Sequence, residues 1–168
     1  DPGTEPAEGL NRPSRTFQQR YRAQLPPEEL SGLDAAELSG RIRAHFEFGH
    51  RRAAGEQLLR VITPLAETDG WEAEGATVIQ LVTDDRPFLV ESLTMELARQ
   101  GWSLRRLFHP QLVVQRDASG VVVDSGGTER AESWVAMEAL SPLGVGAAQV
   151  SDDLLAGLVA RVHRAIAD

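Results

Sequence analysis

The chain has 168 residues, of which 25% are charged and 42% hydrophobic, and its net charge is −8. This size and composition predict one soluble globular domain with short appendages. The acidic balance argues against a nucleic-acid or anionic-membrane partner, because both are bound through a basic face. The chain begins at Asp1 and ends within a helical pattern, so we expect a piece of a longer protein.

The residue types that are missing exclude several kinds of chemistry. The chain has no cysteine, and all 17 basic residues are arginine. The absence of cysteine excludes a thiolate metal site and a cysteine nucleophile on this chain. The absence of lysine excludes a Schiff base and a Walker-type phosphate loop. No apolar run approaches the ~20 residues of a membrane span and no signal-peptide pattern precedes residue 30, so we expect a cytoplasmic protein.

The first third of the chain predicts helices. Residues 1–13 lack periodicity and are rich in proline, glycine and acid, which is typical of a flexible lead-in. Ser14 is placed to cap a helix that ends at Pro26, and Asp34 to cap a second helix. We expect a helical segment over 14–56. His45 and His50 lie on different faces of the second helix, which favours satisfied or solvated histidines over a metal pair.

The remaining chain alternates strand and helix patterns. Strands are expected at 58–63, 76–82, 102–108, 111–116, 121–123 and 133–140, with helices at 87–100 and from Ser151 onwards. His109-Pro110 interrupts one strand, and residues 117–120 form a turn. Over 57–168 this order predicts an α+β, ferredoxin-like fold. Its four-stranded antiparallel sheet is permuted, with the first strand at the edge and helices on one face.

The turn between the strand at 76–82 and the following helix carries the candidate site. Asp84, Asp85 and Arg86 lie there, and Pro87 suits a first helical turn. Either aspartate could cap the free amides, while an arginine fork beside a helix N-terminus suits a carboxylate ligand. A metal is not expected, because hard cations need several oxygen ligands and no third acidic group follows.

Other chemistry-bearing residues leave alternatives open. Arg105, Arg106 and His109 could form the rim of a groove, or the arginines could be exposed edge residues that discourage sheet pairing. Ser92, Ser133 and His109 could be drawn as a triad, but the sequence gives no sign that they meet. No dinucleotide fingerprint is present, so we expect no catalytic residue and no cofactor on this chain.

The same turn resembles a known family. Residues 85–90, Asp-Arg-Pro-Phe-Leu-Val, are similar to the Asp-Arg-Pro-Gly-Leu-Leu turn of ACT domains, which often bind amino acids. More specifically, residues 83–92, then His109-Pro110, Arg116-Asp117 with Gly120, and Glu132-Ser133-Trp134 resemble the N-terminal region of the large bacterial NAD-dependent glutamate dehydrogenases. That family usually reads Asp-Asp-Met-Pro-Phe-Leu-Val-Asp-Ser, so Arg86 and Glu91 depart from it. The resemblance extends from about Phe17 to the end.

The resemblance implies a parent enzyme that oxidatively deaminates L-glutamate to 2-oxoglutarate with NAD. It also implies that this segment is a non-catalytic ACT-like domain that contacts other domains or subunits of the parent. The alternative is an allosteric amino-acid sensor, with Asp84, Asp85, Arg86, Phe88 and His109 as candidate ligand residues. Phe88 replaces the ACT-domain glycine, and a buried aromatic there would fill the ligand's space, which favours the assembly role.

Overall fold

An antiparallel sheet forms the centre of the computed structural model, which describes residues 12–142 and 152–167. Within these ranges the sheet has six strands, in the order β1-β2-β6-β4-β5, and β3 also pairs with β6. Their bounds are β1 Leu58–Ile62, β2 Thr77–Asp84, β3 Ser103–Phe108, β4 Gln111–Arg116, β5 Val122–Val123 and β6 Thr128–Leu140. The long β6 pairs with β2 along one side, and with β4 and then β3 along the other.

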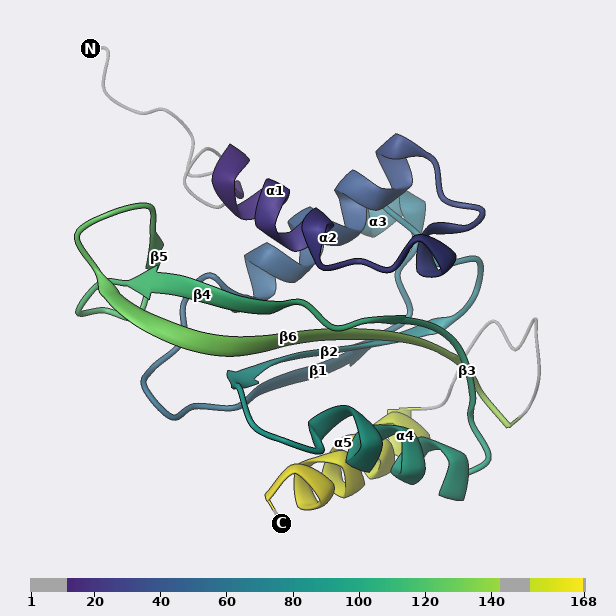
Figure 1. Ribbon diagram of the computed structural model, residues 1–168. Helices are drawn as coiled ribbons and strands as arrows, with labels where there is room; N and C mark the ends of the chain where they lie inside the picture. Colours follow the sequence, from purple (N-terminus) through teal and green to yellow (C-terminus); the bar gives the residue numbers. More distant parts are fainter. Residues whose placement is uncertain (1–11, 143–151, 168) are drawn as a thin grey trace.

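Helices cover both faces of this sheet (Figure 1). On one face lie α1 (Arg15–Ala23), the 3₁₀ turn η2 (Pro27–Leu30), α2 (Ala35–Gly49) and the short α3 (Ala66–Asp69). On the other lie α4 (Leu89–Arg99) and α5 (Asp152–Ala167). The expectation of helices on one face therefore describes α4 and α5 alone, since the N-terminal helices pack on the opposite face.

The central strands explain why two helical layers are needed. In β2, residues 77–83 are all buried, and successive side chains point to opposite faces. Ile79 and Leu81 join β6, α4 and α5 in one cluster, whereas Val82 and Trp134 join Phe17 of α1 and Phe46 of α2 in another. A strand that is apolar on both faces must be covered on both.

Most local expectations are confirmed. Ser14 accepts a hydrogen bond from the Phe17 amide at 3.1 Å, and Asp34 accepts one from the Glu37 amide at 2.8 Å. Strands β1 and β2 pair antiparallel, and His109-Pro110 separates β3 from β4 as expected. The sheet has more strands than the four expected, and β6 begins five residues before the predicted Ser133.

Two further expectations lie wholly or largely outside the described residues, namely the lead-in at 1–13 and the cap at Ser151. In the part of the chain that the structure describes, no helix has the length and apolar character needed to cross a membrane.

Candidate functional site

The turn after β2 differs from its predicted geometry. Helix α4 begins at Leu89, two residues later than expected, and its N-cap residue is Phe88 with φ +63° and ψ 12°. No side chain caps this helix, so the predicted capping by Asp84 or Asp85 is wrong. Both carboxylates are held elsewhere: β2 extends to Asp84, which accepts from Arg52 in the segment after α2, and Asp85 accepts from Ser133 of β6.

Asp85 anchors a small polar network on the sheet face that carries α4. Its amide donates to the Ala131 carbonyl at 3.0 Å. Its Oδ1 accepts from the Ser133 hydroxyl at 2.8 Å and from Gln111 Nε2 at 3.3 Å. His109 Nε2 lies 3.2 Å from Ser133 Oγ. The structure thus brings the predicted Asp85 and His109 together through a residue on β6.

The direction of these hydrogen bonds does not suit nucleophilic catalysis. The Ser133 hydrogen goes to Asp85, so His109 Nε2 must be the donor in its contact with Ser133. A triad needs the reverse, with the histidine accepting the serine proton. Ser133 is also fully buried. Partial burial lowers the pKa of His109, although the carboxylates of Asp85 and Glu91 oppose that shift.

Phe88 and Arg86 of the turn differ in exposure. The Phe88 side chain is 73% exposed, so the expectation that this aromatic fills a ligand pocket is wrong. Arg86 is half-buried and makes no hydrogen bond or ion pair to any described residue. A positive φ is rare for a bulky residue, so Phe88 is held in a strained conformation that glycine would adopt freely.

A buried ionic cluster behind the turn was not identified from the sequence. Glu132, with no exposed surface, accepts from Arg116 through Nε at 2.8 Å and Nη2 at 2.9 Å. Arg52 donates to the same carboxylate at 2.8 Å and to Asp84 at 2.8 Å. Trp134 Nε1 contacts Glu132 at 3.2 Å. Two cations and two anions therefore join the end of the helical segment to β2, β4 and β6.

The phase of the side chains along β4 and β6 indicates part of this cluster. Arg116 is in phase with the buried Leu112 and Val114, and Glu132 is in phase with Trp134. Charged residues at inward positions of facing strands predict a buried pair. Arg52 gave no such signal, because it follows the end of α2 in an irregular segment.

Arg105 and Arg106 form neither a groove rim nor an exposed edge. Both contact Glu138, which is 4% exposed and also accepts from Arg41 at 2.7 Å. Arg106 additionally donates to carbonyls of Glu29 and Ser31. Arg106 therefore attaches η2 and the residue after it to the sheet, while Arg105 donates to the Ala73 carbonyl.

His45 is a buried histidine with both ring nitrogens hydrogen-bonded, which is one of the two outcomes expected from the sequence. Its Nε2 lies 3.2 Å from the Leu81 carbonyl, which can only accept, so the proton is on Nε2. Its Nδ1 then accepts from the Tyr21 hydroxyl at 2.7 Å. Burial lowers the pKa of His45 to about 3 and raises that of Tyr21. Among the described residues, no three acidic or histidine side chains gather as metal ligands would.

The fold and the turn define an α+β domain with an antiparallel sheet and a helix pair on the face of the Asp85 network. A family model described as "Glutamate dehydrogenase, ACT1 domain" matches residues 17–142. The chain belongs to this family, which confirms the resemblance drawn from the motifs.

The chain is also similar to two NAD-specific glutamate dehydrogenases. It is 30% identical to that of Halomonas elongata over 102 residues, and 30% identical to that of Pseudomonas aeruginosa over 104 residues. These alignments cover 61% and 62% of this chain, but only 6% of each relative. The chain thus spans a small part of the length of the curated relatives it matches. No solved structure matches it.

Proposed function

We propose that this chain is the N-terminal ACT-like domain of a large NAD-dependent glutamate dehydrogenase, and that it acts as a non-catalytic assembly module. The parent would oxidatively deaminate L-glutamate to 2-oxoglutarate, with NAD bound elsewhere on the enzyme. The family match and the two relatives support the parent's identity. The partners would be other domains or subunits of that enzyme.

The observation that carries the assembly role is Phe88. An aromatic side chain that is 73% exposed on a left-handed backbone has both unfavourable hydration and strain. Burial in a partner would offset both, since covering a phenylalanine stabilises by about 1.5–3 kcal/mol. Aromatic residues of this kind are frequent anchors of protein interfaces.

The polar groups support the non-catalytic part of the proposal. Ser133 is buried and gives its proton to Asp85, and Asp84 is paired with Arg52. These side chains stabilise the turn on which Phe88 is presented. A rigid support of this kind suits an interface anchor, because less conformational entropy is lost on binding.

The test replaces Phe88→Gly in the parent enzyme and in this chain. Glycine relieves the backbone strain, so the fold should not weaken, while association should weaken by about 10- to 150-fold from the lost 1.5–3 kcal/mol. Leu65→Ser removes a different exposed apolar side chain, 56% exposed, and serves as control. Light scattering over a range of concentrations measures both. Equal association of the two variants would reject the anchor role.

A second candidate function is the amino-acid sensor. It is favoured by the half-buried Arg86, which has no partner among the described residues and lies beside the exposed Asp85. The guanidinium would take a ligand carboxylate, and Asp85 its ammonium group. Effector and glutamate would then be coupled reciprocally, by about 1–3 kcal/mol. A thermal-shift screen of the chain with amino acids tests this. An effector response of the parent that survives Arg86→Ala would exclude the site.

A further inference from the structure

A groove of about 520 Å³ lies between α4 and α5. The two helices lie side by side beneath the sheet in Figure 1, and buried residues of both share one hydrophobic cluster. Side chains from both helices line it: Ser92, Met95, Glu96, Arg99, Gln100, Arg161, Arg164 and Ala165. Its volume falls within the range of small-molecule sites.

The lining is basic, although the chain as a whole carries a net charge of −8. Arg161 and Arg164 of α5 are exposed and make no hydrogen bond or ion pair within the described ranges. Arg99 of α4 is 74% exposed and contacts Glu96 at 3.4 Å. Three guanidinium groups therefore face one carboxylate.

That carboxylate is already satisfied. Glu96 is 8% exposed, and it interacts with Arg99 through Oε2 and with Gln100 Nε2, at 3.0 Å, through Oε1. Its charge is therefore directed at groups of its own helix. Within the described ranges, Arg161 and Arg164 on the α5 wall use none of their donors, which leaves these donors for a ligand.

We propose that the α4–α5 groove binds a small anionic molecule that carries at least two carboxylate or phosphate groups. Guanidinium forks bind both groups through paired, charge-assisted hydrogen bonds. Arg161 and Arg164 take one anionic group from α5, and Arg99 takes another from α4. Met95, which is 65% exposed, and Ala165 provide an apolar wall for the carbon skeleton. This site is distinct from the Phe88 turn and does not depend on the assembly role.

The experiment titrates the 168-residue chain with three probes at constant ionic strength: inorganic pyrophosphate, tricarballylate and a tetraglutamate peptide. Isothermal calorimetry and thermal shift measure binding. We expect pyrophosphate or tricarballylate to bind, and whichever binds more tightly identifies phosphate or carboxylate as the preferred group. The double variant Arg161→Gln/Arg164→Gln should bind at least about tenfold more weakly, as expected for a lost charge-assisted hydrogen bond.

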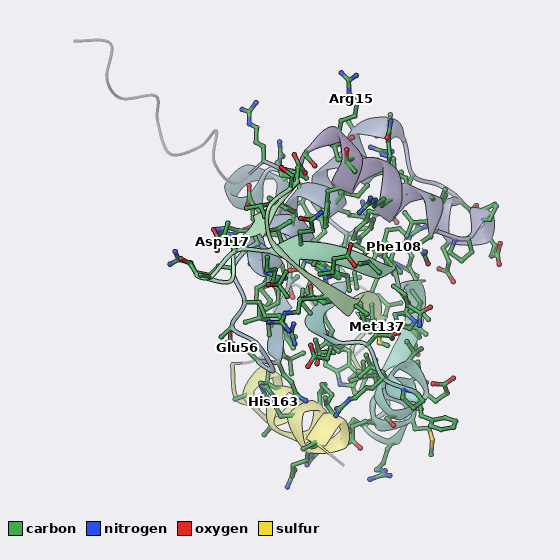
Figure 2. The ribbon with its side chains drawn as sticks, turned by 60° about the vertical axis from the view of Figure 1, so that its left-hand side comes forward. Arg15, Glu56, Phe108, Asp117, Met137 and His163 are labelled. Carbon is green, nitrogen blue, oxygen red and sulfur yellow. The ribbon has the colours of Figure 1, made fainter. Side chains whose placement is uncertain are left out.

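The control variant is Arg15→Gln/Arg130→Gln, which removes two exposed arginines outside the groove. Figure 2 places Arg15 at the opposite end of the molecule from His163 of α5. The control should bind as the wild type does. Three outcomes would overturn the proposal. They are equal losses of affinity in both double variants, no binding of pyrophosphate and no binding of tricarballylate, and binding of the peptide alone. The single variants Arg161→Gln and Arg164→Gln decide the outcome if the double variant melts non-cooperatively.

Discussion

Replacing Glu132 by glutamine should destabilise the fold severely while preserving the shape of the side chain. The carboxylate is fully buried and accepts four contacts, three from the guanidinium groups of Arg52 and Arg116 and one from Trp134. Glu132→Gln converts one acceptor oxygen into an NH₂ donor, which must then face another donor. Among the described residues, it also leaves Arg52 with Asp84 alone, whose side chain is 57% exposed, and Arg116 with no carboxylate partner.

The magnitude follows from the burial of both partners. Arg52 is 1% exposed and Arg116 4%, so water cannot replace the lost charge. Removing one member of a buried ion pair costs about 3–5 kcal/mol. A domain of this kind has a total stability of about 5–15 kcal/mol, so the variant should lie close to the unfolding threshold.

Urea unfolding followed by tryptophan fluorescence measures this loss, because Trp134 lies in the cluster. Glu129→Gln is the matched control: it is on the same strand but exposed, and should change the free energy of unfolding by less than about 0.5 kcal/mol. A loss below about 1 kcal/mol in Glu132→Gln would refute the assignment of Glu132 as the central counter-charge.

Three other predictions concern pH and packing. Because the pKa of His45 is about 3 when folded and 6.5 when unfolded, only the unfolded state binds this proton between those values. Its contribution to stability should therefore be full above about pH 6.5 and fall by up to about 1.4 kcal/mol per pH unit below it. In His45→Gln this slope should disappear from urea unfolding at a series of pH values. Gly49→Ala should lower stability by about 1–3 kcal/mol, since a Cβ there would lie 2.6 Å from the Trp134 ring. Gly157→Ala, in open space on α5, should instead raise it by about 0.5–1 kcal/mol. Thermal melts measure both changes: a rise in Gly49→Ala would contradict the first assignment, and a fall in Gly157→Ala the second.

The sequence by itself determined the local elements of this protein. Ser14 and Asp34 cap their helices because a cap needs only a side-chain oxygen and an amide three residues away. The interruption at His109-Pro110 was also predictable from local chemistry, since proline has no amide hydrogen to donate to a strand. The motifs also identified the family, which the match over 17–142 confirms.

Only the tertiary structure decided which of these residues meet. Asp85 holds Ser133, and Glu132 holds Arg52, across separations of 48 and 80 residues, which no local pattern encodes. The predicted capping by the aspartates was wrong because long-range partners compete for the same oxygens. Phe88 was expected to fill the space that a glycine leaves open in the turn of ACT domains. Its left-handed backbone turns it towards solvent instead, since the direction of a side chain depends on the backbone conformation that its surroundings impose.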